Sequence, residues 1–328
     1  TGGLMSVVKF GVFINTSTVH EAVEQAVSAE SDGFFSASVN DHFYSPLGQA
    51  ETPQVECFTT LTAMAMATSR IKLAPAVAAA SFRSPPLLAK IMCSLDAVSN
   101  ERAICGLGAG WQDKEYINHG YAFPPLKERL EQLDETIQIL KAMNSQESPT
   151  YRGKYFQIKD AYNNPRPLRG HIPLMLGGSG TGLLKIAARE ADILNIIPPT
   201  GNGKDFINDT VATVKFNMDV LKSRIALLHT MMRDIGRDPK EIELGGLALL
   251  GLSEDKCDPS LREMASHLGF PDYATAQGAP VTLLGTAEEA RAELRKRIEE
   301  TGVTYYIFVM ANPESQEIFA KDVMPEFL

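Results

Sequence analysis

An aspartate and a histidine follow a short apolar run near the start of the chain. The run Phe34–Val39 leads through Asn40 into Asp41 and His42. Because imidazole titrates near neutral pH, His42 is a candidate general acid or base. Asp41 could orient a ligand or cap the element that follows. A structural role is the alternative for His42, and it is the more common one for a lone histidine.

Small residues end the next apolar run and leave space beside this pair. The run Ile71–Ala79 contains mostly alanine in its second half. Such a lack of bulk at a strand end suits a planar ring, although tight barrel packing is the alternative. Arg83 follows, and its guanidinium could hold a phosphate or carboxylate, or pair with an acidic loop residue.

A glycine-rich segment, Gly106–Trp111, follows a third run. Its G-x-G-x-G spacing departs from the G-x-G-x-x-G that binds dinucleotides, and Trp111 stands where that motif needs a small residue. We therefore interpret Gly108 and Ala109 as a strand end kept open for a flat ligand. A glycine-rich turn without a ligand is the alternative.

A second glycine-rich segment, Gly177–Gly182, precedes a helical pattern. It is not a P-loop, because Leu183 and Leu184 stand where that motif needs lysine and serine or threonine. Free backbone N–H groups at a helix start bind anions. The segment therefore predicts a site for a cofactor phosphate, with a flexible loop as the alternative; the residues concerned are Gly177, Gly178, Ser179 and Gly180.

Apolar runs and helical patterns alternate along the chain and must position these residues. Eight runs predict strands, which favours a (β/α)8 TIM barrel over an open doubly wound sheet. The runs are Val8–Ile14, Phe34–Val39, Ile71–Ala79, Arg102–Gly108, Pro173–Gly177, Ile193–Ile197, Ile242–Leu250 and Tyr305–Met310. Helical spacing predicts helices at Val19–Ser31, Thr59–Thr68, Pro86–Ser99, Leu126–Met143, Gly182–Ala191, Val211–Ile235 and Ala287–Thr301.

Two segments interrupt this alternation. Asn144–Ile172 predicts a hairpin and an extended loop inserted between the fourth and fifth strands, and such an insertion often forms a lid over a site. Ser253–Pro280 has weak periodicity and predicts an added helix and loop near the seventh repeat. No linker divides the chain, so we expect one domain over residues 5–328, with residues 1–4 a remnant of recombinant expression.

Composition limits the classes of partner. The formal net charge of -9 disfavours nucleic acid and anionic membranes. No run of about 18 apolar residues and no secretion signal occurs, so we expect a cytoplasmic protein. The four cysteines lack metal-binding spacing, Cys93 and Cys105 read as buried thiols, and we expect no metal site.

These motifs together resemble the bacterial luciferase-like flavin monooxygenase superfamily, and within it the branch that uses the deazaflavin coenzyme F420. The resemblance extends from about Phe10 to Phe308. It rests on Asn40–Phe43, Thr68–Leu73, Pro86–Lys90, Leu95–Ser99, Gly106–Trp111 and Gly177–Gly180, with Tyr116–Pro124 and Asp160–Pro167 adding to the branch-level likeness.

The resemblance implies the roles of several residues. A coenzyme ring would lie across the carboxyl ends of the strands, with Asp41 and His42 contacting coenzyme and substrate and His42 accepting a proton. The family's bulge after the third strand, often with a non-prolyl cis bond, corresponds to Ala76 and Val77. Sugar-phosphate dehydrogenases of the family place a glutamate general acid where this chain has Trp111, which we instead expect to stack in the substrate pocket.

The implied activity is hydride transfer between coenzyme F420 and a small organic substrate. An FMN-dependent monooxygenase that uses molecular oxygen is the alternative on the same fold, and a non-catalytic flavin-binding barrel is a third possibility. A basic groove near Arg83, Lys185 or Arg189 would favour the deazaflavin, because that coenzyme has a long acidic tail. The family also implies a homodimer.

Overall fold

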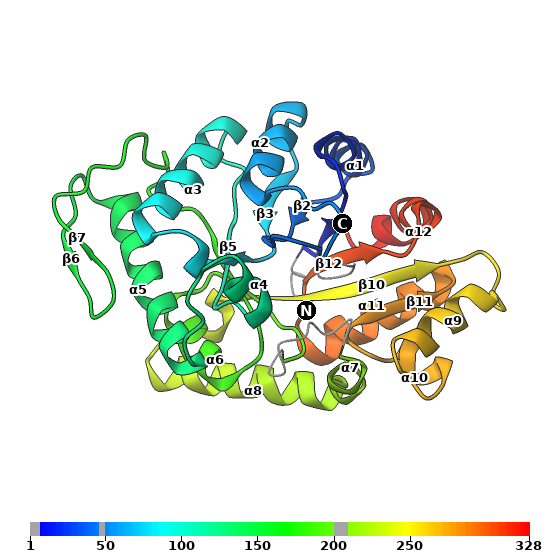
Figure 1. Ribbon diagram of the computed structural model, residues 1–328. Helices are drawn as coiled ribbons and strands as arrows, with labels where there is room; N and C mark the ends of the chain where they lie inside the picture. The colour runs from blue at the N-terminus through cyan, green and yellow to red at the C-terminus, as the bar shows by residue number, and fades with distance from the viewer. Residues whose placement is uncertain (1–6, 46–49, 200–208) are drawn as a thin grey trace, which may run out of the picture.

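A ring of parallel strands surrounded by helices forms the core of the computed structural model, which describes residues 7–45, 50–199 and 209–328 (Figure 1). The predicted remnant at residues 1–4 lies outside the described residues. The strands of the ring are β1 (Lys9–Ile14), β2 (Ser36–Val39), β3 (Lys72–Pro75), β4 (Ala78–Ala79), β5 (Cys105–Gly108), β8 (Leu174–Gly177), β9 (Ile193–Asn195), β10 (Glu243–Leu252) and β12 (Tyr305–Met310).

The ring closes where β3 and β4, the two ends of the hydrogen-bonded order, follow one another in the chain. Hydrogen-bonded neighbours run in the order β3-β2-β1-β12-β10-β9-β8-β5-β4, and β4 pairs in parallel with β5. A parallel bridge between Leu73 and Ala103 also joins β3 to the residues before β5. The predicted run Ile71–Ala79 is thus two segments separated by Ala76 and Val77. The predicted (β/α)8 barrel is confirmed, with all eight strand runs in place.

Helices cover the outside of the ring (Figure 1). The principal ones follow their strands in the order α1 (Val19–Ser31), α2 (Cys57–Ala67), α3 (Pro85–Ser99), α5 (Leu126–Ser145), α6 (Thr181–Glu190), α8 (Met218–Asp234), α11 (Ala287–Thr301) and α12 (Pro313–Ile318). Side-chain caps define several starts; Thr286, for example, begins α11 with a capping box. None of the helices in the described ranges combines the length and apolar character needed to cross a lipid bilayer.

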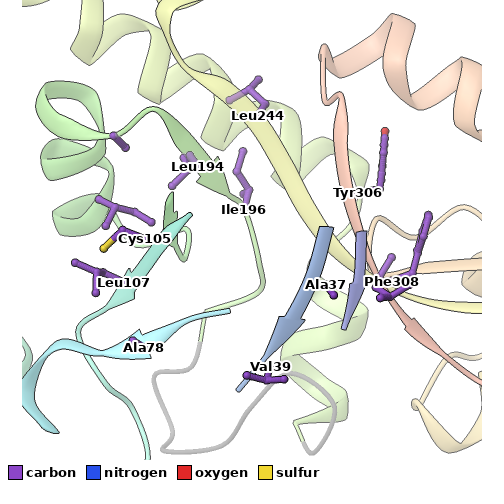
Figure 2. Close-up of a cluster of buried hydrophobic side chains, with 14 of the residues drawn as sticks. Ala37, Val39, Ala78, Cys105, Leu107, Leu194, Ile196, Leu244, Tyr306 and Phe308 are labelled. Carbon is purple, nitrogen blue, oxygen red and sulfur yellow. The ribbon is translucent and has the colours of Figure 1, made fainter. Parts of the chain in front are cut away.

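Alternation along the strands divides the core into an inner and an outer layer. On β12, Tyr305 and Ile307 pack inside the ring, whereas Tyr306 and Phe308 pack toward the helices. Figure 2 shows outward-facing side chains of this kind on several strands. Glycine at position 106 lets β5 pass close to the end of β3, because a Cβ there would overlap the carbonyl oxygen of Pro75. The two layers hold the strand ends, and the loops that follow them, in fixed positions.

The second half of the barrel departs from prediction at two places. The predicted helix Val211–Ile235 is two helices, α7 (Thr210–Lys215) and α8, because the Asn217 side chain accepts the N–H of Val220 and starts a new helix. Strand β11 (Thr282–Gly285) was not predicted; it pairs with the carboxyl half of β10. The added segment before it holds α9 (Pro259–His267) and α10 (Tyr273–Gln277).

The predicted hairpin insertion is present, but it forms no lid. Its strands are β6 (Tyr151–Arg152) and β7 (Gln157–Ile158), which pair antiparallel beyond the outer face of α5 (Figure 1). The Glu135 carboxylate on α5 accepts the N–H groups of the turn, including those of Tyr155 and Phe156. None of the residues lining the central cavity comes from Asn144–Ile172, so the prediction of a lid is wrong.

Candidate active site

A cavity of about 690 Å³ opens at the carboxyl ends of the barrel strands. Active sites of TIM barrels lie at this face because the loops after the strands converge there. All the residues predicted to touch the coenzyme ring, its phosphate or the substrate line this one cavity: Asp41, His42, Ala76, Val77, Gly108, Ala109, Trp111, Gly177, Gly178, Ser179 and Gly180. The structure therefore brings the candidates together, while their individual roles remain predictions.

His42 is held by a carboxylate that the sequence reasoning missed. The Nδ1 atom of His42 lies 2.8 Å from Oε2 of Glu115, whose side chain has no exposed surface. The indole of Trp111 meets the imidazole edge to face, with ring centroids 5.3 Å apart. Glu115 belongs to the short helix α4 (Asp113–Asn118), which follows β5. No pattern in the sequence pointed to this contact, because α4 is too short to show a period.

Asp41 is engaged by protein groups on both carboxylate oxygens. The Arg83 guanidinium donates to Oδ2 at 2.7 Å and to Oδ1 at 2.9 Å, and the N–H of Ala79 donates to Oδ2 at 3.0 Å. Arg83 also donates to Glu56 at 2.8 Å. Burial alone would lower the pKa of Arg83, but hydrogen bonds with Asp41 and Glu56 outweigh it and raise that pKa. Of the two interpretations of Arg83, pairing with acidic residues is the correct one.

The floor of the cavity forms around Val77. The peptide bond between Ala76 and Val77 is cis, as the family resemblance implied. A Cβ at Gly108 would lie 2.8 Å from Val77 Cγ2, and one at Gly177 would lie 3.1 Å from Val77 Cγ1. Glycine at both strand ends therefore leaves the Val77 side chain room between them. The result is a surface without bulky side chains on which a flat ring system fits.

The glycine-rich loop meets the start of α6 beside the cavity. Gly180 is the N-cap of this ten-residue helix and no side chain caps it, so the first backbone N–H groups are available to an anion. Gly178 has φ of +143°, a conformation that favours glycine. Ser179 is buried and lines the cavity with both glycines. This loop fits a phosphate group.

Arg129 lies in the same cavity wall and has no carboxylate partner in the described part of the chain. Its guanidinium donates to carbonyl oxygens of Pro124 and Gly110 and lies 4.0 Å from the centre of the Phe123 ring. Burial lowers the pKa of Arg129. A guanidinium compensated only by carbonyl dipoles and a ring face is suited to a second anionic contact.

The expected basic groove is not formed by the three residues named from sequence. Arg83 is paired with Asp41 and Glu56, Arg189 pairs with Asp134 at 2.6 Å, and Lys185 is exposed on α6. None of Arg83, Lys185 and Arg189 lines the cavity. This criterion therefore does not support the deazaflavin; the arginine that lines the cavity is Arg129, which the sequence did not indicate.

A sequence model described as luciferase-like monooxygenase matches residues 2–305. The chain belongs to the luciferase-like monooxygenase family. Members of this family are enzymes. An uncharacterised protein of Mycobacterium tuberculosis is 33% identical over 180 residues, covering 50% of this chain and 63% of the relative. The F420-dependent glucose-6-phosphate dehydrogenase of Kineococcus radiotolerans is 30% identical over 190 residues, covering 57% of this chain and 54% of the relative. The chain thus matches less than two thirds of the length of these relatives.

Solved structures of the luciferase-like fold superpose along nearly the whole chain. An F420-dependent secondary alcohol dehydrogenase, in complex with an F420–acetone adduct, has a TM-score of 0.80 at 20% identity, covering 98% of this chain and 100% of that chain. The monooxygenase RslO1 from Streptomyces bottropensis has a TM-score of 0.76 at 19% identity, with coverage of 98% and 100%. At such identities the two likenesses establish the fold alone.

Proposed function

We propose that this luciferase-like protein is an oxidoreductase that exchanges a hydride between coenzyme F420 and a small organic substrate. The observation that carries the proposal is one cavity that combines a flat floor, an uncapped helix start and a histidine fixed by a buried carboxylate. Relatives at about 30% identity that are named as F420-dependent dehydrogenases support the choice of coenzyme.

The residues present fit a tricyclic coenzyme with a phosphorylated tail. Ala76, Val77, Gly108 and Ala109 would lie against the ring, and Gly177–Ser179 with Gly180 would hold the phosphate. Arg129 adds a positive charge to the same wall. Bound there, the coenzyme supplies a ring carbon that takes up or gives a hydride. The protein supplies binding and orientation.

His42 accepts or donates the proton that accompanies the hydride. Because Glu115 occupies its Nδ1, the Nε2 atom is the one left to exchange a proton with a substrate hydroxyl or carbonyl oxygen. Trp111 lies against His42 and forms a wall of the substrate pocket. Position 111 carries this tryptophan and not the glutamate general acid of the sugar-phosphate dehydrogenases, so we propose a substrate other than a sugar phosphate.

An FMN-dependent monooxygenase is the second candidate, because solved monooxygenases share the fold over 98% of this chain. Reduced flavin reacts with oxygen, whereas a deazaflavin carries carbon in place of the reactive nitrogen. Oxygen consumption that depends on FMN, with no reaction of the deazaflavin, would favour this candidate.

The test is a turnover assay on the wild type and His42→Asn. Oxidised coenzyme F420 is incubated with a panel of neutral alcohols, and its reduction is followed by absorbance. We expect reduction by the wild type and a loss of roughly 10²- to 10⁴-fold in His42→Asn, with coenzyme binding retained. Binding without turnover in the wild type across the panel would instead indicate a non-catalytic barrel.

We also propose a homodimer. Exposed apolar side chains on the neighbouring helices α2 and α3, namely Met66, Leu87 and Val98, support it, because such side chains are commonly covered in an assembly. Sedimentation equilibrium of the wild type should give twice the chain mass of 35.8 kDa. A monomer mass at micromolar concentration would contradict the proposal.

A further inference from the structure

Glu115 is a buried carboxylate whose two oxygens both serve the loop that carries His42. Oε2 lies 2.8 Å from Nδ1 of His42, and Oε1 accepts the backbone N–H of Phe43. Since an ionised carboxylate has no proton to donate, it accepts at both atoms. Burying such a group is costly unless it is hydrogen-bonded. The two contacts with His42 and Phe43 offset this cost, and they hold the loop in place.

Helix α4 is anchored to the barrel independently of His42. The Tyr116 side chain, next to Glu115, is buried, and its hydroxyl lies 2.7 Å from that of Ser81. A methyl group at Gly110 would overlap the Tyr116 hydroxyl, so glycine there makes room for this contact. The anchor connects α4 to the segment after β4. Glu115 is therefore presented to His42 from a fixed support.

A second contact joins α4 to the same loop. The ring of His119 stacks on Phe43, with centroids 4.1 Å apart and planes inclined by 16°, and its Nδ1 lies 2.8 Å from the carbonyl oxygen of Glu115. His42 and Phe43 are thus both held by α4 and by His119, the residue that follows it. This leaves the imidazole of His42 little freedom to rotate.

We propose that Glu115 is the positioning residue of the site, which fixes the ring proton of neutral His42 on Nδ1 and leaves the Nε2 lone pair toward the cavity. In general, the partner of one ring nitrogen decides the tautomer and orientation of a histidine. Neighbouring carboxylates do not take this role: Asp41 is saturated by Arg83 and Ala79, and Asp113 accepts the N–H of Lys114. The catalytic value of the arrangement rests on the proposed function, whereas the tautomer does not.

The test is ring ¹⁵N–¹H correlation spectroscopy on coenzyme-free protein labelled at histidine, at a pH where imidazole is neutral. His42→Asn assigns the signals among the six histidines. We expect the wild-type His42 to carry its proton on Nδ1, and Glu115→Ala to lose that pattern in favour of the Nε2–H form that imidazole prefers in water. The matched control is Asp113→Asn, an acidic residue of the same helix and cavity, which should leave the His42 tautomer unchanged.

The outcomes separate this proposal from the proposed function. An Nε2–H tautomer in the wild type overturns it, even if Glu115→Ala does not fold, and so does an unchanged tautomer in Glu115→Ala. With an active substrate in hand, Glu115→Ala should lower kcat roughly 10- to 100-fold while coenzyme affinity is retained. An Nδ1–H tautomer without any deazaflavin turnover would leave the role of Glu115 standing and refute the proposed function.

Discussion

Replacing Arg83 with methionine should be strongly destabilising, because Arg83 neutralises Asp41, a buried residue that lines the cavity. The Asp41 side chain is only 5% exposed and that of Arg83 14%, whereas Glu56, the other partner of Arg83, is 50% exposed. Among the described residues, Arg83→Met would leave the buried Asp41 carboxylate with one donor, the N–H of Ala79. Removing one partner of a buried ion pair costs about 3–5 kcal/mol. Because the Ala79 hydrogen bond survives, we expect the lower end, about 3 kcal/mol.

Urea unfolding followed by circular dichroism measures this free energy. The double variant Asp41→Asn/Arg83→Met is the control: it removes the orphaned charge and should recover part of the loss. A cost below about 1 kcal/mol for Arg83→Met, the range of an exposed ion pair, would show that Arg83 does not compensate a buried charge on Asp41. It would mean that Asp41 is available to orient a ligand, which is one of the two roles that the sequence allowed.

Three further substitutions probe Glu30, the anchor of α4 and the floor of the cavity. Burial of Glu30 opposes its ionisation, but the N–H groups of Ile71, Arg70 and Ser69 outweigh it and lower its pKa from 4.5 to about 2. The resulting stabilisation, about 1 kcal/mol after solvent screening, should be full above pH 4.5 and disappear toward pH 2. If the difference in unfolding free energy between wild type and Glu30→Gln is equal at pH 7 and pH 3, this expectation is wrong. Gly110→Ala should lower the melting temperature, because its φ is +76° and the methyl group overlaps the Tyr116 hydroxyl, and Tyr116→Phe should restore part of the loss; no drop in calorimetry would show that α4 is not anchored there. Gly108→Val should weaken coenzyme binding roughly tenfold or more by filling the space beside Val77, and unchanged affinity in a fluorescence titration would place the ring elsewhere.

The fold and the cavity were accessible from sequence because both depend on local patterns. Each barrel strand is a short apolar run, and in a parallel barrel the residues after such runs converge at one face. This is why Asp41, Val77 and Ser179, far apart in the chain, line the same cavity. The split of the third strand at Ala76 and Val77 came from the family resemblance, not from periodicity.

The features that were missed depend on contacts between distant or very short segments. Helix α4 has six residues, too few for a periodic pattern, so Glu115 gave no sign of facing His42, 73 positions earlier. The partner of Arg83 lies 42 positions away, and two interpretations were equally compatible with its sequence context. Strand β11 has four residues, and it is a strand because β10 extends beyond the ring and offers it an edge.

We propose above that the cavity binds a deazaflavin beside His42. Trp111 is the only tryptophan of the chain and lies at this cavity, so its fluorescence reports occupancy directly. The decisive measurement is a titration of the coenzyme-free protein with coenzyme F420 and, separately, with FMN. We expect saturable quenching by coenzyme F420 at submicromolar concentration and much weaker binding of FMN. Submicromolar binding of FMN with no response to coenzyme F420 would contradict it.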